Sequence, residues 1–145
     1  IIKTQYPETE LYLIGSNPTD QVMQLKSNSI HVTGYVTDEE LAAHYASARV
    51  AVVPLRFGAG VKNKVVEAMA YGVPLITTEV GIQGLVGAAQ LIPVTSVATD
   101  FAHHLLNVIG SDEKWREYAN AGNQYVAAHY SLGTMIATLK KSFLD

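Results

Sequence analysis

The sequence contains no cysteine, so disulfide bonds, thiol catalysis and cysteine-ligated metal sites are excluded. It also lacks an excess of positive charge, since 10 Lys and Arg face 13 Asp and Glu and the formal net charge is −3. Proteins that bind nucleic acids normally carry a basic surface, so we expect no nucleic-acid partner. Long apolar runs are missing too, and the run at residues 50–55 is far shorter than the roughly 20 residues that cross a bilayer. What remains is a chain that is 48% hydrophobic, which is enough to bury a compact core.

The length of 145 residues suits one compact domain, and we predict a single domain over residues 1–145. The chain does not begin with Met, and its first residues have the pattern of a helix end that Pro7 stops. We therefore expect a first strand and most of its helix to lie upstream of Ile1, in a longer protein.

Short apolar runs alternate with helical patterns along most of the chain. The predicted strands are residues 11–15, 30–34, 50–54, 74–78 and 91–94, and the predicted helices are residues 18–26, 38–48, 61–71, 97–109, 112–129 and 132–143. Because the strand runs are continuously apolar, both faces of their sheet should be covered. The fold class is therefore α/β, with a parallel sheet and helices on both faces.

Three helix ends carry capping signals. Thr37 and Glu40 have the spacing of a capping box, in which each side chain accepts a hydrogen bond from the other residue's amide. Gly72 followed by Pro74 is a typical helix stop, and Ser131 is placed as the N-cap of the last helix.

Ligands of open parallel sheets bind beyond the carboxyl ends of the strands, where this chain has a glycine-rich loop after residues 50–54. Gly58 and Gly60 let the backbone approach a ligand, and the free amides of the following helix can hold an anion. Lys62 and Lys64 are predicted to stand in the first turn of that helix, where the dipole disfavours a cation by about 0.3–1 kcal/mol unless a phosphate lies between the lysines and the amides. The alternative is that both lysines point to water and the glycines only make a turn.

Glu67 interrupts an otherwise apolar stretch of the same predicted helix. It follows Val61 by six residues, about 9 Å along the helix axis, a distance that suits a carboxylate binding a ribose whose diphosphate rests on the helix start. The alternative is an i,i+3 ion pair with Lys64.

These residues carry a family resemblance. Residues 50–78, with GAGVKNKVVEAMAYGVP at 58–74, resemble the donor-binding core of the retaining family 4 glycosyltransferases, whose two-domain architecture is called GT-B. Most of the chain shares the resemblance, which implies that it is the Rossmann-like C-terminal half of a GT-B fold, with its first strand missing.

The resemblance also implies roles for individual residues. Glu67 is expected to bind the ribose hydroxyls of a nucleotide sugar. The amides from Gly58 to Val61 are expected to bind the diphosphate and the sugar, and Tyr35 and Val36 are expected to lie beside the base. In the loop at residues 79–84, Glu79 and Gly81 are candidate sugar contacts. The full set of predicted donor-binding residues is Tyr35, Val36, Arg56, Gly58, Ala59, Gly60, Val61, Lys62, Lys64 and Glu67.

The loop departs from the family pattern at Ala59, where members have an acidic residue eight positions before the glutamate. A subgroup with the loop Gly-x-Gly-x-Lys-x-Lys-x-x-Glu shares this departure. Because Ala59 carries no carboxylate, the loop is not expected to supply a carboxylate-based catalytic group at that position. A phosphate-binding arginine and lysine of the family, the acceptor site and a catalytic histidine are expected outside this chain. No catalytic residue is therefore assigned within it.

We predict a glycosyltransferase domain that binds a nucleotide-diphosphate sugar, without a metal or cofactor, and transfers the sugar with retention to a polysaccharide or glycoconjugate. The expected partners are the missing N-terminal acceptor domain, the nucleotide sugar and a saccharide or lipid-linked acceptor. The expected location is cytoplasmic, with peripheral contact at the inner membrane face left open. The alternatives are a sugar-nucleotide epimerase of GT-B architecture and a non-catalytic flavodoxin-like binding module.

Overall fold

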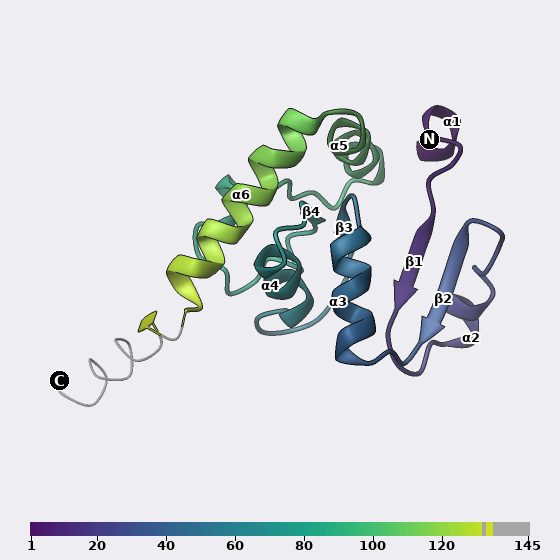
Figure 1. Ribbon diagram of the computed structural model, residues 1–145, viewed down its shortest axis with the longest axis horizontal. Coiled ribbons are helices and arrows are strands. Elements are labelled where there is room, and N and C mark those ends of the chain that lie inside the picture. Colours follow the sequence, from purple (N-terminus) through teal and green to yellow (C-terminus); the bar gives the residue numbers. More distant parts are fainter. Residues whose placement is uncertain (132, 135–145) are drawn as a thin grey trace. The chain divides into compact units, whose positions relative to one another are not determined.

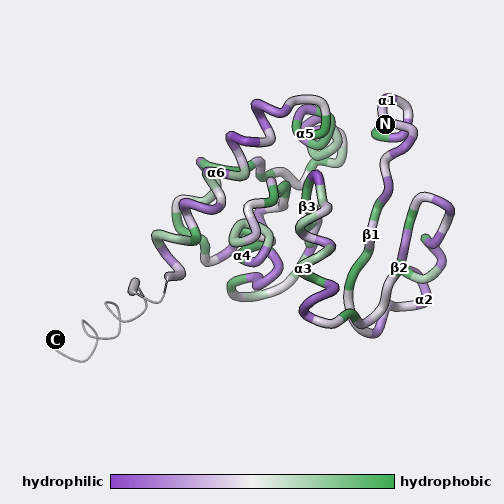
Figure 2. Tube along the Cα trace, in the orientation of Figure 1, coloured by the Kyte–Doolittle hydropathy of each residue, from purple (hydrophilic) through white to green (hydrophobic). Residues whose placement is uncertain are grey.

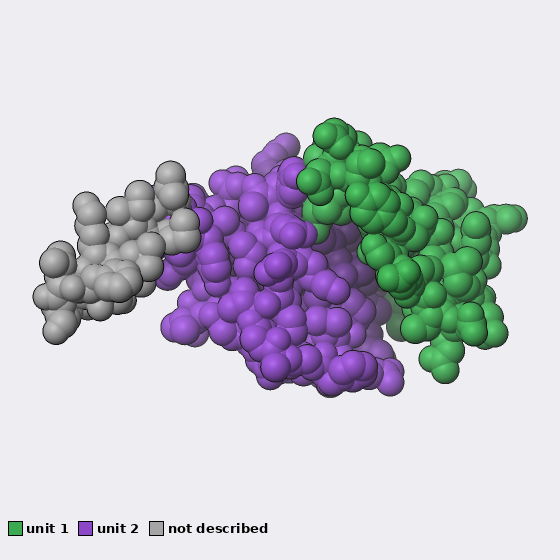
Figure 3. Space-filling model, turned by 90° about the horizontal axis from the view of Figure 1, so that it is seen from below, with its two compact units in different colours: residues 1–47 green, residues 48–145 purple. Residues whose placement is uncertain are grey.

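The computed structural model describes residues 1–131, 133 and 134, and its chain divides into two compact units, Ile1–Ser47 and Ala48–Asp145 (Figure 3). We call them unit 1 and unit 2. Their α-helices and β-strands are labelled in Figure 1.

Unit 1 is built on two parallel strands, β1 (Leu11–Ile14) and β2 (Ile30–Gly34). Leu11 pairs with Ile30, and the register shifts between Leu13 and Ile14. Three helices complete the unit: α1 (Ile2–Gln5), α2 (Asp20–Met23) and α3 (Asp38–Ser47). The ending of α1 at Gln5 confirms the helix end predicted before Pro7.

The helix boundaries of unit 1 follow from its caps. The predicted helix at residues 18–26 was too long, because Thr19 caps α2 by accepting a hydrogen bond from the Val22 amide and the helix ends at Met23. The capping box of α3 is confirmed. The Glu40 amide donates to Thr37 Oγ1 at 3.2 Å, and the Thr37 amide donates to Glu40 Oε2 at 2.7 Å.

Unit 2 contains the parallel strands β3 (Ala51–Val53) and β4 (Leu75–Thr77), with Ala51 paired to Leu75. Its helices are α4 (Asn63–Ala70), the short 3-10 helix η1 (Ala88–Gln90), α5 (Ala98–Gly110) and α6 (Asp112–His129). The strand predicted at residues 91–94 is reduced to one parallel bridge between Thr77 and Val94. The described strands thus form two separate two-stranded sheets, because β1 pairs only with β2 and β3 only with β4 among the named strands.

The buried core lies in unit 2, where α4 packs between the strands and α6. Gly122 makes the close approach of α6 to α4 possible, since a Cβ at this position would lie 3.1 Å from Met69 Cγ. Figure 2 shows polar and apolar residues intermixed along α6, in keeping with one face packed inward. The largest fully buried side chains are those of Met69, Leu75, Ile76, Val65, Val108, Thr77 and Pro74.

A Schellman motif ends α4 and confirms the predicted stop. Gly72 has φ of +67°, its amide donates to Met69 O, and the Val73 amide donates to Ala68 O, both at 3.0 Å. Glycine adopts this left-handed conformation without the steric penalty of a side chain. Pro74 then leads directly into β4.

The end of the described chain supports one more cap. Ser131 Oγ accepts a hydrogen bond from the Thr134 amide at 3.2 Å, as an N-cap side chain does. The predicted helix at residues 132–143 otherwise lies outside the described residues. Within the part of the chain that the structure describes, no helix is both long and apolar enough to cross a membrane.

Candidate functional site

The loop between β3 and α4, residues 54–62, presents unpaired backbone amides. Gly58 has φ of +138° and Gly60 has φ of +70°, so both residues use the left-handed freedom of glycine. No amide from residue 56 to residue 64 donates a hydrogen bond to an acceptor in the described part of the chain. These donors are therefore available to an anion at the start of α4. We call residues 54–62 the donor loop, after the nucleotide-sugar donor that they are predicted to bind.

The start of α4 differs from the prediction in one respect. Lys62 is the N-cap rather than a first-turn residue, and α4 begins at Asn63. The Lys62 ammonium donates to Gly60 O at 2.5 Å, so this side chain folds back over its own loop. Gly58 leaves room for it, because a Cβ there would lie 3.1 Å from Lys62 Cε. Lys64, by contrast, stands in the first turn of the helix as predicted.

Glu67 lies within α4 and is partly buried. The i,i+3 ion pair with Lys64 that the sequence left open does not form. Its carboxylate has neither a hydrogen bond nor an ion pair with any residue from 1 to 131, 133 or 134. A partly buried carboxylate without a partner remains free to accept hydrogen bonds from a ligand.

The loop after β4, residues 78–87, lies against the donor loop; we call it the supporting loop. Thr78 Oγ1 donates to Leu55 O at 2.6 Å, and Thr77 Oγ1 donates to Val53 O at 2.9 Å. Farther along, Gly84 is so close to Val61 that a Cβ on the glycine would lie 2.8 Å from Val61 Cγ2. Sequence patterns gave no signal for these threonine contacts, because they depend on which strand ends are neighbours.

The two candidate sugar contacts in the supporting loop are engaged within the protein. Glu79 accepts a hydrogen bond from Ser96 Oγ, and this bond holds the pKa of the Glu79 carboxyl below its usual value. Gly81 is buried, and a Cβ there would lie 1.9 Å from Thr77 Oγ1. Packing against Thr77 therefore explains why glycine stands at position 81.

The predicted residues are divided between the units. Tyr35 and Val36 follow β2 in unit 1, and the Tyr35 side chain is 76% exposed. The other predicted donor-binding residues, Arg56 to Glu67, all belong to unit 2.

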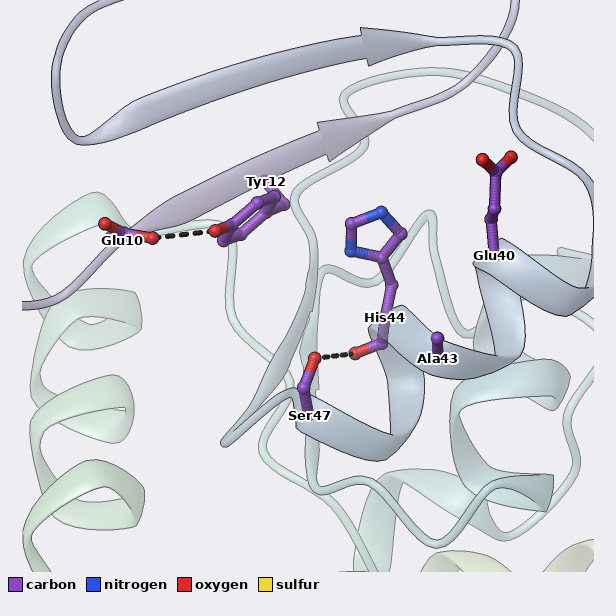
Figure 4. Close-up of a pocket in the computed structure, with 6 residues that line it drawn as sticks. All are labelled: Glu10, Tyr12, Glu40, Ala43, His44 and Ser47. Atoms are coloured by element: carbon purple, nitrogen blue, oxygen red, sulfur yellow. Dashed lines mark hydrogen bonds between the residues drawn. The ribbon is translucent and has the colours of Figure 1, made fainter.

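Unit 1 has a pocket of its own, which the sequence did not indicate (Figure 4). Tyr12 on β1 stacks on His31 with ring centroids 4.6 Å apart and lies 5.3 Å from the His44 ring. Tyr12 OH donates to Glu10 Oε2 at 2.7 Å, and this bond raises the pKa of the Tyr12 phenol. The pocket is lined by Glu10, Tyr12, Glu40, Ala43, His44 and Ser47. In the described residues no group of three or more His, Asp or Glu side chains is placed to hold a metal ion.

Comparison with known proteins identifies the family. The family model described as glycosyl transferases group 1 matches residues 1–111. The chain belongs to this family. A relative, the O-antigen chain mannosyltransferase B of Escherichia coli, is 35% identical over 103 residues, which are 70% of this chain and 26% of that protein. The chain thus spans about a quarter of the length of this curated relative.

Solved structures agree on the fold. The sucrose-phosphate synthase of Thermosynechococcus elongatus matches with a TM-score of 0.75 and 23% identity over 97% of this chain and 40% of the other. The structure of TarM matches with a TM-score of 0.80 and 14% identity over 99% of this chain and 30% of the other. The predicted α/β fold, that of part of a GT-B glycosyltransferase, is confirmed.

Proposed function

We propose that this chain forms the donor-binding part of a glycosyltransferase that takes a nucleotide-diphosphate sugar as its donor. The observation that carries the proposal is the run of unpaired amides from residue 56 to residue 64, which spans the donor loop and the start of α4. The same helix bears Glu67, which has no partner among the described residues. Amides and the positive end of a helix dipole suit a diphosphate, and a free carboxylate one turn farther along suits ribose hydroxyls.

The chemistry requires that negative charge on the departing nucleoside diphosphate be stabilised. Donors already aimed at the position where charge develops provide this stabilisation without reorganising. We assign it to the donor-loop amides together with Arg56, Lys62 and Lys64, which are the cations of this loop and helix start. Transfer with retention to a polysaccharide or glycoconjugate acceptor belongs to the same proposal, with the acceptor site in the rest of the protein. The name of the curated relative makes a mannosyl donor and an O-antigen glycan the first substrates to test.

The test is calorimetric titration of the full-length protein with UDP, GDP and TDP. We expect one nucleotide to bind, and Glu67→Gln to weaken its affinity by about tenfold, because a charged acceptor of hydrogen bonds is lost. The matched control is Glu113→Gln, which neutralises an exposed carboxylate on α6 of the same unit and leaves the affinity unchanged. Failure of the wild-type protein to bind any of the three nucleotides would overturn the proposal.

Product analysis separates transfer from epimerisation. A transferase releases the nucleoside diphosphate only as the acceptor is glycosylated, whereas a sugar-nucleotide epimerase of similar architecture produces an altered sugar without an acceptor. We expect glycosylated acceptor, and accumulation of an epimerised sugar would replace the transferase proposal with the alternative.

A further inference from the structure

Thr78, at the carboxyl end of β4, joins the two loops that meet in unit 2. Its side chain is buried, and its hydroxyl makes two hydrogen bonds. Thr78 Oγ1 donates to Leu55 O at 2.6 Å and accepts from the Gly81 amide at 3.2 Å. One hydroxyl therefore ties the first part of the donor loop to the supporting loop.

A second contact lies near the other end of the donor loop. Gly84 has φ of +81° and sits against Val61, the residue that precedes the N-cap of α4. A Cβ on Gly84 would lie 2.8 Å from Val61 Cγ2, closer than non-bonded carbon atoms can approach without displacement. The supporting loop thus touches the donor loop at Leu55 and again at Val61.

Between these two points the donor loop has little internal support. Within the described chain, the single internal hydrogen bond of the donor loop joins the Lys62 ammonium to Gly60 O, and the loop amides from residue 56 onward are unpaired. Two glycines with positive φ add conformational freedom to the loop. A loop of this kind holds its amides in one arrangement only if neighbouring structure fixes it.

We propose that Thr78 and Gly84 are positioning residues for the donor site. Neither residue contacts the donor; they set the course of the donor loop between Leu55 and Val61, and through it the direction of the amides that bind the diphosphate. The inference rests on the proposed function and adds a determinant of donor affinity that lies outside the donor loop and α4.

The principal test compares Thr78→Val with Thr78→Ser in the full-length protein. Valine keeps the shape of threonine but removes the hydroxyl, which leaves Leu55 O and the Gly81 amide without their partner. We expect Thr78→Val to weaken binding of the nucleoside diphosphate by about tenfold and to raise the KM for the donor more than it lowers kcat. Thr78→Ser retains the hydroxyl and should restore both values.

A matched control separates positioning from loss of stability. Trp115 Nε1 donates to Arg49 O at 2.7 Å. Arg49 precedes β3, so this bond lies beyond the amino end of the strand, whereas the donor loop follows its carboxyl end. Trp115→Phe also removes one side-chain hydrogen bond to a backbone carbonyl. We expect it to lower the melting temperature without changing nucleotide affinity.

Gly84→Ala provides an independent variant, because the exposed Gly84 can be changed without creating a buried polar group. The added methyl displaces Val61, and we expect a severalfold loss of nucleotide affinity. The probes are UDP, GDP and TDP, and the one that wild type binds most tightly is used for all variants. Absence of wild-type binding defeats the proposed function itself. If wild type binds and the affinity is unchanged in Gly84→Ala and Thr78→Val, the positioning role is wrong. It is also wrong if Trp115→Phe and Thr78→Val weaken the nucleotide affinity equally.

Discussion

The two compact units of the chain differ in what holds them together. Unit 2 contains every fully buried side chain of the described residues, including Met69, Ile76 and Val108. In unit 1 every residue is exposed or only partly buried. Because burial of apolar surface is the main favourable term in folding, unit 2 has a hydrophobic core of its own and unit 1 does not.

The comparison bears on function, because the donor loop and Glu67 lie in unit 2, whereas Tyr35 and Val36 lie in unit 1. Unit 1 is held chiefly by the backbone pairing of β1 with β2 and by the cluster of the Tyr12, His31 and His44 rings. The predicted diphosphate and ribose contacts therefore stand on the better packed unit. Those predicted for the base stand on the more weakly packed one.

The largest test of this difference is a pair of identical substitutions. Met69 in α4 is 1% exposed, and Met23 in α2 is 44% exposed. Met69→Ala should lower the free energy of unfolding by about 2–5 kcal/mol, because it leaves a cavity in a packed core. Met23→Ala should lower it by less than about 1 kcal/mol.

The measurement is urea denaturation followed by tryptophan fluorescence. Trp115 is the single tryptophan of the sequence and lies in unit 2, so its emission reports the unfolding of that unit. Hydrogen exchange of residues 11–14 follows unit 1 in the same samples. Similar losses for the two methionine variants would contradict the assignment of the core to unit 2 alone.

Sequence patterns predicted local structure well where a single segment determines it. The capping box at Thr37 and the helix stop at Gly72 depend on residues five or fewer positions apart, and both are confirmed. Lys62 was placed wrongly, inside the helix. Its extended backbone conformation puts it at the N-cap, and the helical period alone does not reveal that conformation.

Contacts between distant segments were the part that the sequence could not predict. The bond from Thr78 to Leu55 O exists because β4 pairs with β3 in a particular register, and no spacing in the chain encodes that pairing directly. For the same reason the pocket around Tyr12 and His44 was missed, since its members come from a strand and a helix of unit 1. The roles of the donor-binding residues remain predictions.

A second test, smaller in size, compares the N-caps of the two units. Thr37 caps α3 in unit 1, and Ser111 caps α6 in unit 2 by accepting from the Lys114 amide at 3.2 Å. Replacement of either cap by alanine should cost about 0.5–2 kcal/mol of helix stability. We expect Thr37→Ala to accelerate hydrogen exchange in α3 with little change in Trp115 fluorescence, and Ser111→Ala to shift the fluorescence transition. The reverse pattern would show that the units do not differ in this way.

The smallest effects concern pH, beginning with unit 2. Arg49 Nη2 donates to Asp112 Oδ1 at 2.7 Å, and this hydrogen bond, together with the positive charge, holds the pKa of the Asp112 carboxyl below its usual value. A group whose pKa is lowered by folding stabilises the folded state at pH values above its pKa in the unfolded chain, which is about 3.9 for Asp. This contribution is lost as the pH falls through the folded-state pKa. The stability difference between wild type and Asp112→Asn should therefore be largest near neutral pH and vanish in acid. Both partners are solvent-exposed, so the difference will be small and should shrink further in high salt.

In unit 1 the corresponding effect appears at the opposite end of the pH scale. The hydrogen bond from Tyr12 OH to Glu10 raises the pKa of the Tyr12 phenol. A raised folded-state pKa stabilises fully below the unfolded value, about 10, and the contribution is lost as pH rises through the folded-state pKa. Tyr12→Phe removes the proton that the bond requires but keeps the ring that stacks on His31. We expect this variant to accelerate hydrogen exchange of β1 at neutral pH and to match wild type in strong alkali. A constant difference across that range would mean that ring packing, rather than the hydrogen bond, holds Tyr12 in place.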